Sequence, residues 1–403
     1  MRRTLLTALS ALAVLTCIPS IAQALTPPAA PRHVTSGQRF TVSGAAPLKS
    51  RVEVEVYRRT RGQWRYVRTA VVRHYGGQVT ANPYAALPSQ SSKVAYHFHA
   101  SGGADDGSAA LPDMLAAYED AAFDAAVWSG HDTVHESPGA AIVGIRGVEE
   151  TVWSVGCMMH IVSFPATAEN PSTDPQTIID GASVAVLAHP NMNSPTIPRG
   201  DATGRGGITA AQALSLTGYD GIAVFNPYSE CGEACDVWDA VLSTGRQVYG
   251  YAEDDAHALL NVGRCWNVVY ADALTEATVV ESLRSGRFYA TQGPTLALQV
   301  GPRALTLRSD APARLRIIGR DGALLSESEG MTLRYVYRPG DLYVRCEVIR
   351  ASDGLKAWTQ PVFLSRRKQA YRLSVKLSRP GRYRLRAVAS SGESQLSHVV
   401  RVR

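Results

Sequence analysis

The two ends of this chain resemble each other and differ from everything between them. Residues 36–73 carry nine basic and two acidic side chains, and residues 366–403 carry eleven basic side chains and one acidic. Residues 74–365 carry 18 basic and 32 acidic side chains, so their net charge is −14, although the whole chain has a formal charge of +6. This segregation of charge favours at least two structural units over one uniform domain.

Both ends also share a period-two pattern that predicts β-strands. "RVEVEVYRR" near the N-terminus and "GRYRLRAVAS" near the C-terminus alternate apolar with polar or basic residues. Each end supplies about three strands, whereas together they approach the seven or so of an immunoglobulin-like sandwich. We therefore expect residues 25–79 and 366–403 to form one basic β-sandwich, with the remaining residues inserted into one of its loops. The alternative is two unrelated β extensions.

The middle of the chain has a different periodicity. Over residues 80–298, short apolar runs such as "VAVLAHP" alternate with helical patterns such as "ITAAQALSLTG". Apolar strands that alternate with helices predict a parallel sheet covered on both faces, and some seven or eight such units predict a closed barrel. After Gly293–Pro294 the helical patterns stop, so residues 299–365 are expected to be a β-rich extension of this domain. The predicted fold class is α/β with additional all-β regions.

The N-terminus has the pattern of an export signal. Met1–Arg2–Arg3 precedes an apolar stretch, and Ala22–Gln23–Ala24 ends it, which predicts a cleaved signal peptide over residues 1–24. The paired arginines leave both the general and the twin-arginine export routes open. No later segment is long and apolar enough for a membrane helix, so we expect a periplasmic or secreted protein without a transmembrane segment. In that compartment Cys231 and Cys235 would form a local disulfide or remain free thiols.

Histidines and acids recur at one structural position in the middle region, at or near the carboxyl end of an apolar run. They are His97, His99, Asp106, His131, Glu149, His160, His189, Asp255 and His257. Because parallel barrels carry their chemistry on the loops at the carboxyl ends of the strands, these nine side chains are expected to converge at one mouth. Imidazole and carboxylate ligands without thiolate suit zinc, manganese or iron.

The order H-x-H, D, H, E, H, H, D-x-H across roughly residues 93–300 resembles the PHP (polymerase and histidinol phosphatase) family of metal-dependent hydrolases. "VLAHP", "DDAH" and "ESLRSGRFYATQGP" are the more specific pieces of this resemblance. The last of them, with "YVRCEVIRASDGLKAWTQPVFL" behind it, resembles the subgroup that includes carbamate-pesticide hydrolases. The resemblance implies a distorted (β/α)7 barrel for residues 80–298 and two or three bound divalent cations.

The resemblance also implies which side chains hold each cation. The first position would use His97, His99, Glu149 and Asp255, which would form the catalytic centre. The second would share Glu149 as a bridging ligand and add His160 and His189. The third would use Asp106, His131 and His257. The chain departs from the family pattern at Ala100, where the family has threonine, and in a longer loop after it. Asp105 and Glu150 therefore stay open as alternatives to Asp106 and Glu149.

Substrate-binding residues are harder to identify from the sequence. Arg264 and Arg287 are candidates for binding an anionic group because a guanidinium matches the geometry of phosphate, and a structural salt bridge is the alternative for each. Tyr289 is a candidate for the mouth of the site, with packing as its alternative. Asn226, which ends an apolar run, is a candidate for supporting the ligands.

These features predict an exported metal-dependent phosphoesterase. Two cations bridged by a carboxylate share a water molecule, lower its pKa and hold it as hydroxide for attack on phosphorus. Hydrolysis of a carbamate, ester or amide by the same site is the alternative. A different class, a non-catalytic envelope-binding protein, would use the basic β-sandwich to bind anionic polymers or lipid headgroups. A nucleic-acid partner is not expected.

Overall fold

The computed structural model describes most of the chain. The described residues are 27–46, 52–72, 79–136, 138–154, 157–192, 207–227, 232–338, 340–364, 369–389 and 394–403. The expected signal peptide and Cys231 lie outside them. The chain forms two compact units, one from Met1–Tyr75 with Lys368–Arg403 and the other from Gly76–Arg367. We call them the split unit and the central unit.

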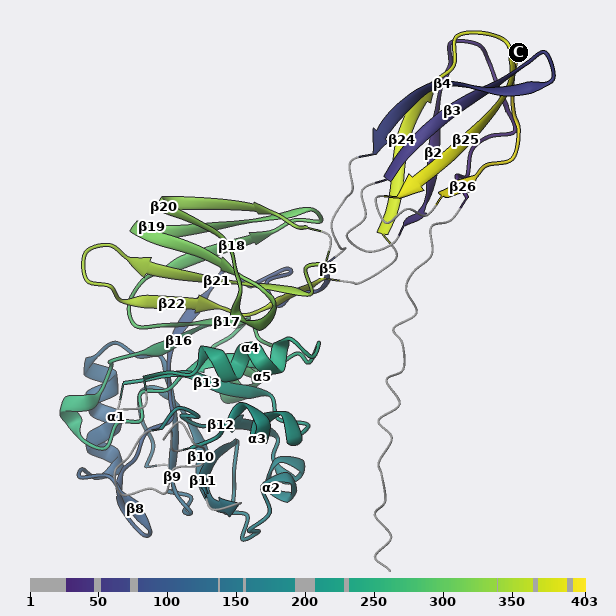
Figure 1. Ribbon diagram of the computed structural model, residues 1–403. Coiled ribbons are helices and arrows are strands. Elements are labelled where there is room, and N and C mark those ends of the chain that lie inside the picture. The colour runs from purple at the N-terminus through teal and green to yellow at the C-terminus, as the bar shows by residue number, and fades with distance from the viewer. Residues whose placement is uncertain are drawn as a thin grey trace, which may run out of the picture. The chain divides into compact units, whose positions relative to one another are not determined.

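Strands from the two ends of the chain pair with each other in the split unit (Figure 1). The N-terminal strands are β1 (His33–Val34), β2 (Arg39–Ala46), β3 (Val52–Thr60) and β4 (Gln63–Val72), and the C-terminal strands are β24 (Gln369–Lys376), β25 (Gly381–Ala389), β26 (Ser394–Leu396) and β27 (Val400–Val402). One sheet has the order β1-β27-β25-β3-β4, with β26 on β25, and β2 and β24 form a second sheet.

The period-two pattern explains this arrangement. Along β3 every second side chain is buried, beginning with Val52, and β25 alternates in the same way. The antiparallel register sets Val54 opposite Ala387 and Val56 opposite Leu385, so both strands turn their apolar faces the same way. These faces share one core with apolar residues of β2 and β24, which leaves the basic side chains on the outside.

The central unit contains a closed barrel of mixed strands (Figure 1). Strands β6 (Ser91–Tyr96), β9 (Ala125–His131) and β10 (Val143–Ser154) pair in parallel, as do β12 (Val184–Leu187), β13 (Gly221–Asn226) and β15 (Tyr249–Ala252). Between these two groups, β11 (Cys157–Phe164) is antiparallel to both β10 and β12. Short strands β5 (Val79–Ala81) and β14 (Gly232–Glu233) also belong to the barrel, whereas β7 (Ser101–Gly102) and β8 (Asp105–Asp106) form a separate two-stranded sheet.

Helices are fewer than the sequence pattern led us to expect. The described residues contain α1 (Leu111–Asp120), α2 (Pro175–Gly181), α3 (Ala210–Ser215), α4 (Cys235–Leu242) and α5 (Glu276–Arg284), with 3₁₀ turns η1 (Leu259–Asn261) and η2 (Arg320–Gly322). No helix separates β10 from β11, because the connection between them spans two residues and only an antiparallel hairpin fits it. The structure is therefore strand-rich and does not show the seven β/α units of a (β/α)7 barrel.

The chain after α5 is built from strands, as the change of pattern near Gly293 predicts. These strands are β17 (Phe288–Thr291), β18 (Leu296–Val300), β19 (Ala304–Ile318), β20 (Leu324–Val336), β21 (Tyr343–Arg350), β22 (Lys356–Thr359) and β23 (Val362–Leu364). Strand β16 (Trp266–Tyr270), which precedes α5, pairs antiparallel with β6 of the barrel and with β17, and β17 pairs antiparallel with β22.

A buried ionic network fastens this β-rich part to α4. The Arg345 guanidinium on β21 donates to Asp239 Oδ2 at 2.6 Å and to Glu347 Oε1 at 2.6 Å. Arg345 is buried, so these two carboxylates, rather than water, stabilise its positive charge.

Two further sequence expectations concern membranes and cysteines. None of the described helices has the length and apolar character that spanning a membrane requires. Among the described residues, Cys235, Cys265 and Cys346 are free thiols. Cys231 lies outside the described residues, so the alternatives of a local disulfide or free thiols at Cys231 and Cys235 stay a prediction.

Candidate metal centre

The barrel strands bring all nine side chains that the sequence singled out to one place. His97 and His99 follow β6, His131 ends β9, Glu149 lies within β10, and His160 lies within β11. His189 follows β12, Asp255 and His257 follow β15, and Asp106 ends β8. The register pairs Glu149 with His131 and sets His160 opposite Thr151, which is two residues beyond Glu149 and on the same face of β10.

The carboxylate of Glu149 lies at the centre of the cluster and is fully buried. Its Oε1 atom is 2.8 Å from His160 Nδ1 and 2.9 Å from His189 Nε2. Its Oε2 atom faces a second group, with distances of 3.3, 3.2 and 3.1 Å to His97 Nε2, His99 Nε2 and His131 Nδ1. The two oxygens of one carboxylate therefore serve two separate sets of imidazoles.

Asp255 supplies a second carboxylate to the first of these sets. Its Oδ1 atom is 3.3 Å from His97 Nε2 and 3.1 Å from His99 Nε2. Its Oδ2 atom accepts a hydrogen bond of 2.8 Å from Asn226 Nδ2. Asn226 thus supports a ligand candidate, as its position at the end of an apolar run suggested.

Asp106 and Asp105 have different surroundings, and these separate the two alternatives. Asp106 Oδ1 is 3.1 Å from His257 Nε2 and 3.8 Å from His131 Nε2, on the exposed side of the cluster. Asp105 faces the other way and lies 2.7 Å from His99 Nδ1 and 2.8 Å from His135 Nε2. Burial would raise the pKa of Asp105, but these two imidazoles hold it well below its ordinary value. Asp105 therefore orients His99 from behind.

Glu150 is separated from Glu149 by the pleat of β10. Successive side chains of a strand point to opposite faces, and Glu150 accepts a hydrogen bond of 2.8 Å from Ser163 Oγ. Burial raises the pKa of Glu150 to about 7 despite that hydrogen bond. Glu149 and not Glu150 is the member of the cluster.

Three residues that support the cluster were not identified from the sequence. They are Asp105, which was considered only as an alternative ligand, His135 and Glu253. Glu253 is fully buried, and its Oε2 atom is 3.2 Å from His97 Nδ1. Its Oε1 atom accepts hydrogen bonds from the main-chain N–H of His189 at 2.7 Å and from Asn226 at 2.8 Å. The acidic run Glu253–Asp254–Asp255 was the available signal, because consecutive acids at a strand end cannot all face solvent when the strand is buried.

Three of the cluster residues have a backbone conformation that side chains other than glycine seldom adopt. The φ angles of His97, His189 and Asp255 are 61°, 25° and 47°. Such conformations cost free energy and concentrate at functional sites, where the surrounding contacts hold them in place. Here Glu253 contacts both His97 and the main chain of His189.

The donor set has the composition and spacing of a site for divalent cations. Burial opposes protonation of His97, but Glu149 and Asp255 outweigh it and raise the pKa of His97 to about 10. Buried carboxylates this close together require a positive partner. Four overlapping sets have ligand atoms within 4.8 Å of one another: His99, Asp106, His131 and His257; His97, His189 and Asp255; His97, His99 and Glu149; and His131, Glu149 and His160.

No contact among the described residues joins either candidate arginine to this cluster. The Arg264 side chain is exposed, and its main-chain N–H donates to Asp254 Oδ1 at 2.9 Å. Arg287 directly precedes β17, and its carbonyl accepts a hydrogen bond from the main-chain N–H of Tyr270 at the end of β16. That end of β16 pairs with the start of β6, whereas the far end of β17, at Thr291, lies near the carboxyl end of β6. Arg287 therefore lies at the barrel end opposite the histidines.

Tyr289 also lies away from the mouth of the site. Its side chain is buried in the apolar core of the β-rich part, with Leu296 and Ala357 among its neighbours. The packing alternative holds for this residue.

Comparisons with known proteins add little to this geometry. No protein-family model matches the chain, and neither does any curated protein. A solved structure from Bacteroides vulgatus ATCC 8482, described as a two-domain protein containing a predicted PHP-like metal-dependent phosphoesterase, is similar at 12% sequence identity and a TM-score of 0.38. The likeness covers 75% of this chain and 99% of that one. A TM-score this low does not establish a shared fold.

Proposed function

We propose that this chain is a metal-dependent hydrolase that acts on phosphoesters. The observation that carries the proposal is the position of Glu149, whose two carboxylate oxygens face two different groups of histidines. A carboxylate that bridges two cations in this way is typical of hydrolytic sites with paired metals. Divalent cations held there would activate a water molecule and neutralise charge that develops on a substrate oxygen.

The ligand assignment follows from these contacts. His97, His99, Glu149 and Asp255 would form the first set, Glu149, His160 and His189 the second, and Asp106, His131 and His257 the third. The four overlapping sets support the first and third groupings, with His189 added to the first and His99 to the third. For the second grouping they place His131, and not His189, with Glu149 and His160. Asp105 and Glu253 would keep the rings of His99 and His97 in their orientation, as carboxylates behind ligating imidazoles commonly do.

The exposed members of the cluster indicate where substrate enters. The side chains of Asp106, His131 and His257 are 62%, 20% and 14% exposed, whereas those of His97, His99 and Glu149 are fully buried. Substrate would therefore approach past Asp106, with its scissile group directed toward Glu149. Asp106 and the two neighbouring imidazoles would position that group.

The proposal is tested by metal analysis and hydrolysis assays on the purified chain. We expect at least two divalent cations per chain, and hydrolysis of p-nitrophenyl phosphate or bis-p-nitrophenyl phosphate in preference to p-nitrophenyl acetate and an aryl carbamate. Preference for the acetate or the carbamate would assign the site to the alternative reaction class. Bound metal with no hydrolysis of any of the four substrates would favour a non-catalytic protein.

Neighbouring glutamates on β10 offer a matched pair of variants. Glu149→Gln removes the shared carboxylate, and we expect it to lose a cation and roughly a thousandfold in kcat/KM, since a bound cation supplies several kcal/mol. Glu150→Gln changes the adjacent, equally buried carboxyl, which can still accept from Ser163, and should retain both metal and activity. Equal losses in the two variants, or no loss in Glu149→Gln, would overturn the site.

We also propose that residues 1–24 direct export to the periplasm or the medium. N-terminal sequencing of the mature protein, together with its distribution between cell fractions, tests this. A mature protein that retains Met1 in the cytoplasm would contradict it.

A further inference from the structure

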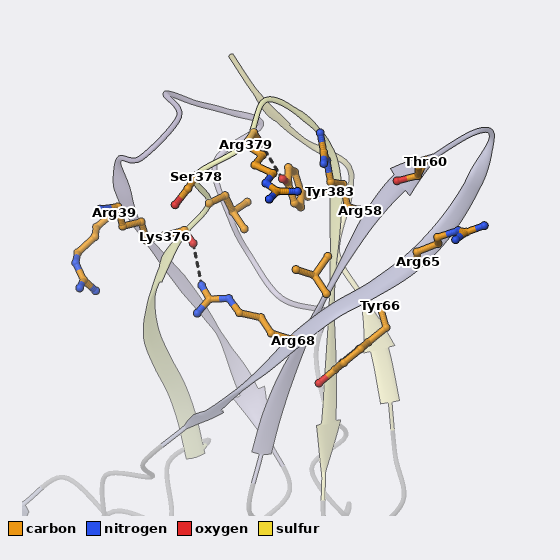
Figure 2. Close-up of a pocket in the computed structure, with 12 residues that line it drawn as sticks. Arg39, Arg58, Thr60, Arg65, Tyr66, Arg68, Lys376, Ser378, Arg379 and Tyr383 are labelled. Carbon is orange, nitrogen blue, oxygen red and sulfur yellow. Dashed lines mark hydrogen bonds between the residues drawn. The ribbon is translucent and has the colours of Figure 1, made fainter.

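The split unit contains a pocket that is lined by strands of both of its sheets and from both ends of the chain. Its volume is about 640 Å³, within the range of small-molecule sites. Arg39, Arg58, Thr60 and residues 65–68 line it from the N-terminal strands, and residues 376–379 and Tyr383 line it from the C-terminal strands. Figure 2 shows Arg39 and Arg65 at opposite rims, with Arg58, Arg68 and Arg379 between them.

Six cationic side chains surround this pocket, and none of the described residues that line it is acidic. They are Arg39, Arg58, Arg65, Arg68, Lys376 and Arg379. Among the described residues none of the six forms an ion pair with a carboxylate, although arginines elsewhere in the same unit do, as Arg386 does with Glu55. The positive charge of the pocket is therefore not neutralised from within the described part of the chain.

Main-chain contacts hold two of these cations in place without reducing their charge. Arg68 Nη2 donates to the carbonyl of Lys376 and Arg58 Nη2 to the carbonyl of Pro380, each at 2.8 Å. The phenol of Tyr383 donates to the carbonyl of Arg379 at 2.8 Å and fixes the same loop (Figure 2). A guanidinium that donates one N–H group to a carbonyl still has other N–H donors for a ligand.

A β-bulge shapes one wall of the pocket. The register of β3 and β4 shifts where Val56 pairs with Arg68 and Tyr57 pairs with Tyr66, so Val67 has no partner. The shift interrupts the alternation of faces, and Tyr66, Val67 and Arg68 are all exposed beside the pocket. A bulge next to a cationic pocket re-aims side chains in a way that a regular strand would not.

We propose that this pocket binds a ligand that carries several phosphate groups. Five of the six cations are arginines, whose planar guanidinium groups match phosphate oxygens in pairs of hydrogen bonds. A single phosphate would satisfy two or three of them, so the six together favour a ligand with several charges. The proposal concerns a unit that contains none of the nine metal-centre residues, and it stands whether or not the chain is a hydrolase.

The binding test uses the full chain and inorganic tripolyphosphate, followed by isothermal titration calorimetry at low salt. The chain is first dialysed against a chelator and then against buffer, so that cations at the candidate metal centre do not contribute. We expect saturable binding that weakens steeply as salt is added, because association with several phosphates releases counterions. No measurable binding at low salt would overturn the proposal.

Two double variants distinguish binding at the pocket from a general effect of the unit's net charge on affinity. Arg39→Gln with Arg379→Gln removes two pocket cations that make no side-chain hydrogen bond among the described contacts, and we expect affinity to fall about tenfold or more. Arg382→Gln with Arg401→Gln removes the same charge from exposed positions outside the pocket lining and should change affinity by less than about twofold. Equal effects of the two changes would reject the pocket.

A vesicle experiment distinguishes a lipid headgroup from a soluble phosphate compound. Vesicles of phosphatidylcholine with and without phosphatidylglycerol are sedimented with the wild-type chain and with both double variants. Binding only to the anionic vesicles, reduced only by the pocket variant, would identify a lipid source. Binding of tripolyphosphate without binding to vesicles would identify a soluble source. Vesicle binding that the two variants reduce equally would contradict a role for the pocket. Thermal unfolding of each variant checks that it is folded.

Discussion

The two charged regions of this molecule, the candidate metal centre and the basic pocket, differ in how far their ionisable groups are buried. The candidate metal centre buries its carboxylates and imidazoles, so that Glu149 and His97 have no exposed area, whereas Arg39 and Arg68 of the basic pocket face solvent. In a buried site each charge needs a specific partner, and removing one leaves the others unpaired. In water, like charges coexist at small cost and salt screens them. Single substitutions should therefore matter greatly in the first region and little in the second.

The largest expected effect tests whether the buried cluster acts as one unit. His189→Ala removes an imidazole that contacts Glu149 Oε1, and we expect kcat/KM for the preferred phosphoester to fall roughly a thousandfold. His398→Ala, an exposed histidine of the split unit, is the control and should stay within about twofold of wild type. Steady-state kinetics and metal content measure both. Unchanged activity in His189→Ala would remove this residue from the site.

The next effect concerns a residue behind a ligand rather than a ligand itself. Asp105→Asn weakens the support of the His99 ring, and metal affinity should fall about 10–100-fold, the usual loss when such a partner is changed. Asp113→Asn, an exposed position in the first turn of α1, should leave affinity unchanged. Competition with a chromophoric chelator gives the affinities. Equal affinities for the two variants would show that Asp105 has no role in metal binding.

A buried charge network that contains none of the candidate ligands, formed by Arg345, Glu347 and Asp239, offers a third test. Burial opposes ionisation of Glu347, but Arg345 and Arg316 outweigh it and hold its pKa below the ordinary value of 4.5. A carboxyl with a lowered folded-state pKa stabilises the protein above its unfolded-state pKa, and this stabilisation is lost as the pH falls below about 4.5.

Urea unfolding at a series of pH values measures the effect. Between neutral pH and the acid limit, the free energy of unfolding of the wild type should fall about 2 kcal/mol further than that of Glu347→Gln, the usual worth of a hydrogen bond to a charged group. Glu329→Gln changes an exposed carboxyl on β20 and should follow the wild-type curve. Parallel curves for wild type and Glu347→Gln would contradict the role of this network.

The smallest expected effect belongs to the basic pocket. Arg379→Gln removes one exposed cation from a group of six, so the free energy of unfolding should change by no more than about 0.5 kcal/mol. The change should be toward higher stability at low salt, and it should vanish at about 1 M salt, where the screening length is about 3 Å. Loss of more than about 1 kcal/mol would mean that this arginine is structural.

Part of the fold follows from local patterns, and the rest depends on pairing that no local pattern encodes. The alternation in "RVEVEVYRR" and "GRYRLRAVAS" predicts strands, and β3 and β25 lie there. The helical pattern in "ITAAQALSLTG" similarly agrees with α3, which lies within it. The alternating pattern of the middle region predicts more helices than the structure contains. Two apolar runs joined by a short turn, as in β10 and β11, look the same in the sequence as two runs joined by a helix.

The candidate site was easier to predict than its support. His97 and Glu149 could be selected because ligand-type residues repeat at strand ends, and the structure brings them together, although their role as metal ligands stays a proposal. Asp105 and Glu253 sit beside other acids in the sequence, and only the direction of each side chain separates a ligand from the group that orients it. Arg287 shows the reverse error, because residue type alone does not reveal which end of a strand it occupies.

The pairing of β3 with β25 has a consequence for how the chain is made. A ribosome delivers β3 long before β25, and the whole central unit is synthesised between them. Domains generally fold as they emerge, so the central unit can fold while the first strands still have exposed edges and no partner. During that interval the nascent N-terminal segment depends on its own charge, or on a chaperone, to avoid aggregation. The split unit can therefore be completed only after the last 36 residues, Lys368–Arg403, have left the ribosome.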